Sequence, residues 1–339
     1  MNGREKRVNP VSDQSPILNV QGLKTQFHTL EGIAKAVDDV SLHASQGETV
    51  GLVGESGSGK SVTVLSIMRL VKSPPGRIVG GSVDFNGTNL MDLPENQMRS
   101  VRGNQISMIF QEPMTSLNPV YTIGNQISEM FAIHKGLSRK ESMERAVEML
   151  ERVKIPSPEK RVREYPYQLS GGMRQRAMIA MALACNPAIL IADEPTTALD
   201  VTIQAQILEL ILELKSQYNT AVLMITHDLG VISQVAQRVV VMYAGKVVEE
   251  GPTRELFSNP MHPYTRGLMA SVPILGQRAA KGRDRLREIP GVVPSLYELP
   301  RGCTFQPRCE ESLPECATEG MPELLLKGEE HRVRCRLYE

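Results

Sequence analysis

The sequence predicts an α/β fold built on a parallel β-sheet. Short, continuous apolar runs are typical of strands buried on both faces of such a sheet. Segments with apolar residues at helical spacing separate these runs, and strands that alternate with helices define the α/β class. A glycine-rich loop joins the first of the runs to a helix. The runs are 49–53, 188–193, 220–226 and 238–245.

Length and composition set the scale of the protein. Its 339 residues suit one large domain with an appendage, and 41% hydrophobic residues suffice for a buried core. The 38 basic and 38 acidic side chains cancel, which argues against a protein that coats nucleic acid. No apolar stretch approaches the roughly 18 residues that span a membrane, and the N-terminus lacks the apolar part of a secretory signal. We expect a cytosolic chain that reaches a membrane only through a partner.

The N-terminal part divides into a leader and a β-rich segment. Residues 1–15 are polar and show no periodicity, so we expect a disordered leader. Short apolar runs between 17 and 53, broken by glycine and charged residues, indicate strands. Residues 61–71 then carry apolar side chains at helical spacing. We expect these segments to begin an α/β domain that covers residues 16–251.

Two further segments interrupt or follow the α/β pattern. Residues 112–168 have helical texture without a strand, which predicts an inserted helical subdomain. Within it, Ser138 and Glu141 have the spacing of a capping box that starts a helix. After Gly251 the composition becomes rich in proline and arginine, so we place a boundary there and a C-terminal extension at 252–339.

The glycine-rich loop is a phosphate-binding motif. It matches G-x-x-x-x-G-K-[ST] and lies between a strand and a helix, which is the context that the motif requires. Backbone N–H groups and the positive end of the helix would bind phosphate oxygens. Lys60 would reach the β- and γ-phosphates, and Ser61 would ligate Mg²⁺. The loop consists of Gly54, Glu55, Ser56, Gly57, Ser58, Gly59, Lys60 and Ser61.

Two acids end the apolar run 188–193. Ligands of open α/β sheets bind at the carboxyl ends of strands, so Asp193 and Glu194 should lie beside the phosphate loop. Asp193 suits the Mg²⁺ shell of a P-loop enzyme. Glu194 is then free to deprotonate an attacking water.

The octapeptide Leu169-Ser170-Gly171-Gly172-Met173-Arg174-Gln175-Arg176 opens an apolar helix whose first N–H groups could bind an anion. A single chain cannot present two such helix ends to one nucleotide, so a second subunit is the natural partner. The octapeptide, the phosphate loop and the acid pair, in this order, resemble the ATP-binding subunits of ABC transporters. The resemblance implies that Ser170, Gly171, Gly172 and Gln175 contact ATP held by a second ATPase subunit.

The same resemblance assigns further positions. Gln111 in MIFQEP matches the Q-loop glutamine, which touches Mg²⁺ and the attacking water. Asp200 in ALD matches the D-loop, which also lies at the nucleotide. His227 in LMITHD matches the switch histidine, which contacts the γ-phosphate.

One aromatic residue should stack on the adenine base. Phe27 is the candidate, and His28 and Phe85 are alternatives because the spacing to the phosphate loop varies. No motif is degraded and Glu194 is intact, so this subunit's own site should hydrolyse ATP.

The extension resembles a narrower group through His262-Pro263-Tyr264-Thr265 and the stretch GCTFQPRC. This group comprises the ATPase subunits of dipeptide and oligopeptide ABC importers, several of which hold a [4Fe–4S] cluster in the extension. Four thiolates suit such a cluster or a structural Zn²⁺, and the missing C-x₂-C pairs favour the cluster. The four cysteines are Cys303, Cys309, Cys316 and Cys335.

Together these features predict the ATPase subunit of a peptide ABC importer at the cytoplasmic face of the cell membrane. The resemblance implies a second, homologous ATPase chain, two membrane permeases and an extracytoplasmic substrate-binding protein as partners, and no nucleic acid. A soluble ABC ATPase acting on nucleic acid or ribosomes is one alternative. An importer of another cargo, such as glutathione or a nickel chelate, is the other.

Overall fold

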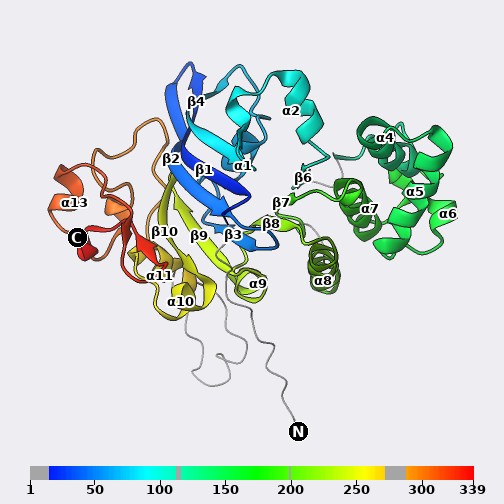
Figure 1. Cartoon of the computed structure of the whole chain (residues 1–339). Helices are drawn as coiled ribbons and strands as arrows, with labels where there is room; N and C mark the ends of the chain where they lie inside the picture. Colours follow the sequence, from blue (N-terminus) through cyan, green and yellow to red (C-terminus); the bar gives the residue numbers. More distant parts are fainter. Residues whose placement is uncertain (1–14, 112–115, 198–199, 272–287) are drawn as a thin grey trace, which may run out of the picture.

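The computed structural model describes residues 15–111, 116–197, 200–271 and 288–339. Within these residues, the central sheet has eight strands in the order β11-β12-β10-β9-β3-β8-β7-β6 (Figure 1). The strands from β9 to β6 are parallel, and β10, β12 and β11 add an antiparallel edge. The strands are β3 (Thr49–Val53), β6 (Ile106–Ile109), β7 (Ile189–Asp193), β8 (Ala221–Ile225), β9 (Arg238–Tyr243), β10 (Lys246–Pro252), β11 (Leu325–Leu326) and β12 (Arg332–Val333).

The parallel strands are buried on both faces, as their apolar runs predict. Every residue of β3, β7, β8 and β9 is buried. Successive residues alternate between two hydrophobic clusters, because side chains of a strand point to opposite faces: Leu190 belongs to one cluster and Ile191 to the other. Helices α7 (Gly171–Leu183), α8 (Val201–Tyr218) and α9 (Leu229–Val235) contribute to the cluster that contains Leu190. The predicted α/β fold is confirmed.

A second sheet covers the other face. It is antiparallel, with the order β2-β1-β4-β5, and Leu18, Val20 and Val83 of its strands share a cluster with Ile67 and Ile191. This sheet contains most of the β-rich segment predicted before the phosphate loop. Its elements and the neighbouring helices are β1 (Leu18–Thr29), β2 (Gly32–Ala44), β4 (Gly76–Phe85), β5 (Thr88–Asn89), α1 (Lys60–Ile67) and α2 (Glu95–Val101).

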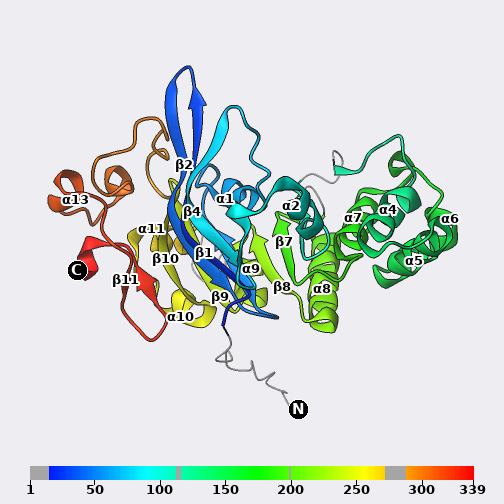
Figure 2. The same ribbon diagram turned by 45° about the horizontal axis from the view of Figure 1, so that its top comes forward.

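A helical lobe lies to one side of the α/β body, opposite the C-terminal extension (Figures 1 and 2). It is formed by α4 (Ile123–Lys135), α5 (Arg139–Arg152), α6 (Pro158–Arg161) and α7. Over 116–168, the described part of the predicted insertion, there are helices and no strand; 112–115 lie outside the described residues. The capping box is confirmed, because the Ser138 hydroxyl accepts from the Glu141 N–H at 3.3 Å and the Glu141 carboxylate accepts from the Ser138 N–H at 2.9 Å.

The C-terminal extension packs on the α/β body rather than standing apart from it. Strand β10 runs through Gly251, and β12 pairs with it, so the last part of the chain extends the central sheet. Tyr264 and Phe305 belong to the same hydrophobic cluster as Tyr243 of β9. The domain boundary at Gly251 stays a prediction. The helices of the extension are α10 (Thr253–Ser258), α11 (Pro263–Ala270) and α13 (Glu315–Thr318).

A buried carboxylate joins the extension to β10. Glu249 accepts hydrogen bonds from the backbone N–H groups of Met261 at 2.7 Å and His262 at 2.8 Å. Its Oε1 also lies 2.8 Å from Nε2 of His331, whose Nδ1 lies 3.3 Å from Glu255. The hydrogen bond to Glu249 raises the pKa of His331, although burial opposes the shift. A protonated His331 therefore stabilises the contact between the extension and β10.

Replacing His331 with glutamine is expected to remove part of the pH dependence of folding stability. The folded-state pKa of His331 lies above the unfolded value of 6.5, so its contribution is complete below pH 6.5 and is lost as the pH rises through the folded-state pKa. Urea unfolding between about pH 6 and pH 9 should show a shallower loss of unfolding free energy in H331Q than in the wild type. H28Q, at an exposed position of β1, is the control. Equal slopes for H331Q and the wild type would contradict the expectation.

Among the described residues, no helix has both the length and the apolar character needed to cross a bilayer. The predicted leader, residues 1–15, falls outside the described residues except for Ser15.

Candidate active site

A cavity of about 540 Å³ opens between the loop after β3 and the antiparallel sheet. We call it the phosphate-loop cavity. Two residues of the C-terminal extension, Leu296 and Tyr297, also line it. The predicted site residues that line it are Phe27, Ser56, Gly57, Gly59, Lys60, Ser61, Gln111 and Glu194.

The phosphate loop needs its glycines for two different reasons. Gly59, the residue before α1, has φ +101°, and a Cβ atom there would lie 2.4 Å from the carbonyl oxygen of Ala36. Gly57 also has a positive φ of +79°, but nothing lies within 4 Å of its Cβ position. Gly59 therefore permits close packing of the loop on β2, whereas Gly57 leaves its backbone open to the cavity.

Lys60 begins α1 and turns back over the loop. Its Nζ donates to the carbonyl oxygens of Gly54 at 2.8 Å and Glu55 at 2.9 Å. Burial lowers the pKa of Lys60, while the nearby carboxylates of Glu194 and Asp193 act to raise it. A phosphate oxygen would be a stronger acceptor than these neutral carbonyls, since charge-assisted hydrogen bonds are about twice as strong.

Ser61 and Asp193 meet across the end of the parallel sheet. The Ser61 hydroxyl donates to Oδ1 of Asp193 at 3.1 Å, so the two oxygens predicted for Mg²⁺ lie side by side. Burial and the charge of Glu194 raise the pKa of Asp193, and the Ser61 hydrogen bond opposes the rise. Hydroxyl and carboxylate oxygens are ligands that Mg²⁺ prefers, so the donor set fits this ion.

Glu194 follows β7 with a left-handed backbone, φ +46°, which is rare for residues other than glycine. Its carboxylate accepts from Nε2 of Gln111 at 3.0 Å and from the Thr197 hydroxyl at 2.9 Å, and it lies 3.4 Å from Nδ1 of His227. Burial acts to raise the pKa of Glu194, but the hydrogen bonds from Thr197 and His227 outweigh it and lower the pKa. The structure thus brings Gln111, Glu194 and His227 together around an ionised carboxylate.

The start of α7 does not reach this cavity. Ser170 caps the helix by accepting from the Met173 N–H at 3.4 Å, and neither Ser170, Gly171 nor Gly172 lines the cavity. Helix α7 belongs to the helical lobe, away from α1 in both views (Figures 1 and 2).

Two other residues predicted to contact nucleotide are engaged within the chain. Gln175 is 1% exposed and donates from Nε2 to the carbonyl oxygen of Pro195 at 2.6 Å, directly after Glu194. Asp200 is exposed and caps α8 by accepting from the Ile203 N–H at 3.0 Å. Ala198 and Leu199 of the D-loop lie outside the described residues. The side chain of Gln175 therefore faces its own chain.

One end of the cavity is aromatic. Phe27 lines it, whereas the alternative Phe85 is buried in the cluster between the sheets. Tyr297 of the extension lines the same cavity, and the Thr29 hydroxyl donates to its phenolic oxygen at 3.1 Å. Sequence reasoning missed Tyr297, because no local pattern relates it to Thr29, which lies 268 positions earlier.

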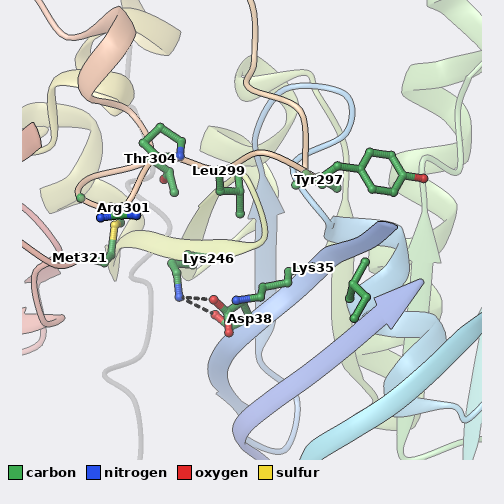
Figure 3. A pocket seen from close by; sticks show the side chains of 12 residues that line it. Lys35, Asp38, Lys246, Tyr297, Leu299, Arg301, Thr304 and Met321 are labelled. Atoms are coloured by element: carbon green, nitrogen blue, oxygen red, sulfur yellow. Dashed lines mark hydrogen bonds and ion pairs between the residues drawn. The ribbon is translucent and has the colours of Figure 1, made fainter. Parts of the chain in front are cut away.

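The loop that carries Tyr297 separates the phosphate-loop cavity from a second cavity of about 390 Å³. Figure 3 shows this second cavity, with the ring of Tyr297 directed away from the ion pair of Asp38 and Lys246. That pair has an Nζ–Oδ2 distance of 2.7 Å, and Lys35 and Arg301 also line the second cavity, so its charged lining is net positive.

The four cysteines of the extension are near one another but are not arranged as a metal site. All are free thiols, and burial raises the pKa of Cys335 to about 11, with Cys303, Cys309 and Cys316 adding to the rise. Among the described residues, which include all four, no group of three or more His, Cys, Asp or Glu is placed to hold a metal ion. The donor types fit a thiolate centre, but ligation requires deprotonation, which burial without a metal disfavours.

The fold and the site define a P-loop ATPase cassette. A family model described as "ABC transporter" matches residues 37–197, and one described as "Oligopeptide/dipeptide transporter, C-terminal region" matches 248–316. The oligopeptide transport ATP-binding protein AppD of Bacillus subtilis is 53% identical over 96% of this chain and 98% of its own length. The protein OppD of Salmonella typhimurium, with the same description, is 51% identical over 88% of each chain.

Solved structures agree with this result. A dimeric post-hydrolysis structure of the ATP-binding cassette MJ0796, bound to ADP and Pi, has a TM-score of 0.63 and 30% identity, and covers 70% of this chain and 99% of that one. The chain belongs to the ABC transporter ATPase family, in the group that carries the oligopeptide/dipeptide C-terminal region. Its activity is ATP hydrolysis.

Proposed function

We propose that this chain is the ATP-hydrolysing subunit of a membrane importer for peptides. One observation carries the proposal: Glu194 contacts Gln111 and His227 beside the phosphate-loop motif, in a chain that matches an oligopeptide transport ATP-binding protein over nearly its whole length.

The residues of the phosphate-loop cavity divide the chemistry among them. Lys60 and the loop N–H groups bind the phosphates of ATP, and Phe27 stacks on the base. Ser61, Asp193 and Gln111 would hold Mg²⁺, which would supply charge neutralisation for phosphoryl transfer. Glu194 accepts a proton from the attacking water, and the lowered pKa keeps it ionised for this task. His227 positions the γ-phosphate from the other side of Glu194.

A second ATPase subunit completes the site. The cavity contains no residue from the start of α7, although Ser170 and Gly171 are exposed at that end of the helix. Helix N-termini favour anions, so ATP bound at the phosphate loop of one subunit would meet this helix end of its partner. ATP would thus stabilise the closed pair by binding it more tightly than the open pair. The partner is proposed to be a similar but distinct chain.

The helical lobe is the proposed contact with two permeases at the cytoplasmic face of the membrane. Val120 is 71% exposed and Tyr121 is 53% exposed, on the segment that leads from Gln111 into α4. Exposed apolar side chains next to the helical lobe suit a surface that contacts a partner protein. A substrate-binding protein on the far side would deliver the peptide.

Purification of the full chain from detergent-solubilised membranes tests these partners. The proposal expects two integral-membrane permeases and a second ATPase to co-purify with it. Recovery with ribosomes or DNA, and without permeases, would overturn it.

We also propose that the thiols of Cys303, Cys309, Cys316 and Cys335 hold a [4Fe–4S] cluster, with Zn²⁺ as the alternative. Support comes from their shared neighbourhood, in which Cys335 interacts with the other three. Anaerobically purified protein should contain about four iron and four sulfide per chain and absorb visible light. Zinc without sulfide would identify the alternative, and protein with neither would exclude both.

A further inference from the structure

An ion pair whose arginine is buried joins the phosphate loop to the C-terminal extension. The carboxylate of Glu55, the second residue of the loop, accepts from Nη1 of Arg308 at 2.7 Å and from Nη2 at 3.0 Å. The Arg308 side chain is only 4% exposed. Two parallel N–H···O bonds fix both the distance and the orientation of the two planar groups. Glu55 belongs to the predicted phosphate-binding motif, yet its side chain turns toward the extension and does not line the cavity.

Arg308 is itself held firmly. Its Nε donates to the carbonyl oxygen of Pro290 at 2.9 Å, and its guanidinium lies 5.8 Å from the centre of the Tyr243 ring. An arginine guanidinium stays charged in proteins, so Arg308 keeps its positive charge beside Glu55. A side chain with these fixed contacts can hold a loop in place rather than follow its movement.

A second contact reaches the backbone of the same loop residue. The Glu55 N–H donates to the hydroxyl of Tyr264 at 2.7 Å. Tyr264 is fully buried and packs against Tyr243 and Phe305, with ring centres 4.6 Å and 5.4 Å apart. Both the side chain and the backbone of Glu55 are therefore bound by residues that follow the ATPase core in the sequence.

These contacts bear on nucleotide binding because of what Glu55 does inside the loop. Its carbonyl oxygen accepts from Lys60 Nζ at 2.9 Å and from the Ser58 N–H at 3.2 Å. A shift of Glu55 would therefore move the lysine and the N–H groups expected to bind phosphate. Without Arg308, the Glu55 carboxylate would also stand unneutralised beside the phosphates of ATP, where like charges repel.

We propose that Arg308 is a positioning residue for the phosphate loop, acting through Glu55, and that the extension is thereby part of the nucleotide site. The proposal rests on the nucleotide site described above. It assigns the extension a role in ATP affinity in addition to any role of the cysteines.

A double-mutant cycle in the full chain tests it, with MgATP affinity and the thermal midpoint measured for each variant. R308Q should weaken MgATP binding about tenfold, which corresponds to a coupling within the usual range for contacting residues. In an E55Q background, R308Q should change the affinity by less than about twofold, because the carboxylate it positions and neutralises is gone. R332Q, which breaks the Arg332–Glu250 pair of the same extension, is the matched control and should leave the affinity unchanged.

Two further variants distinguish a loss of loop positioning from a loss of folding. R308K keeps the charge without the two-pronged geometry and should weaken binding less than R308Q does. Y264F removes only the hydroxyl that accepts the Glu55 N–H, and it should also weaken binding. A lower thermal midpoint with unchanged MgATP affinity, or additive effects of E55Q and R308Q, would overturn the proposal. Failure of the wild type to bind MgATP would instead contradict the proposed function.

Discussion

Replacing Glu194 with glutamine is expected to lower steady-state ATP hydrolysis by about 10²–10⁴-fold while MgATP still binds, because a general base contributes a factor of this size. The amide keeps the size and hydrogen-bonding positions of the carboxylate but cannot accept a proton from water. The contacts of Glu194 with Gln111, Thr197 and His227 place its carboxylate at the centre of the hydrolytic residues. Phosphate release by the assembled complex is the measurement.

The same variant should accumulate as a nucleotide-bound closed pair with its partner ATPase, because closure needs binding and reopening needs hydrolysis. Size-exclusion chromatography with radiolabelled ATP would detect it. E209Q, an exposed carboxylate of α8, is the matched control and should leave hydrolysis unchanged. Retention of full hydrolysis by E194Q would show that another group accepts the proton.

Replacing Lys60 with methionine is expected to weaken MgATP binding roughly 10- to 150-fold. The range follows from the loss of a hydrogen bond to a charged group, which contributes about 1.5–3 kcal/mol. The ammonium group of Lys60 does not extend into solvent, because it lies over the loop and donates to the carbonyl oxygens of Gly54 and Glu55. Isothermal titration with MgATP measures the change.

The control for this variant is K140M, an exposed lysine of α5 that pairs only loosely with Glu144 at 4.0 Å. It should bind MgATP as the wild type does. If K60M binds MgATP with unchanged affinity, the loop does not hold the phosphates as proposed.

Local chemistry explains why much of the fold and site was predictable. The buried parallel strands follow from continuous apolar runs, and the loop of Gly57, Gly59 and Lys60 follows from a motif whose backbone needs glycine. Asp193 and Glu194 end a strand at the edge where the loop also lies, so their proximity to Ser61 follows from the topology.

Several contacts around the site were not predictable. Thr197 donates to Glu194, yet a threonine three residues after an acid carries no signal of its own. Tyr297 and Arg308 reach the site from the extension, and only the folded chain brings them to Thr29 and Glu55. Gln175 donates to the carbonyl oxygen of Pro195 in its own chain, although its place in the motif suggested a contact with ATP held by a second subunit.

The cysteines show a different limit of sequence reasoning. Their spacing led us to expect a common metal site, but among the described residues, which include all four, no group of three or more His, Cys, Asp or Glu is placed to hold a metal ion. Spacing does not determine whether the sulfur atoms are arranged as ligands, because burial stabilises neutral thiols until a metal replaces their protons. Measuring the metal content of the purified protein decides whether the four cysteines bind a metal.

ATP hydrolysis by this chain is proposed to power peptide uptake. This proposal is tested most directly by reconstituting the chain with its second ATPase and the permeases in lipid vesicles, and adding a peptide-loaded binding protein outside. We predict that the loaded binding protein stimulates ATP hydrolysis and drives peptide uptake, and that E194Q abolishes both. Hydrolysis that does not respond to peptide, without any ATP-dependent uptake, would contradict it.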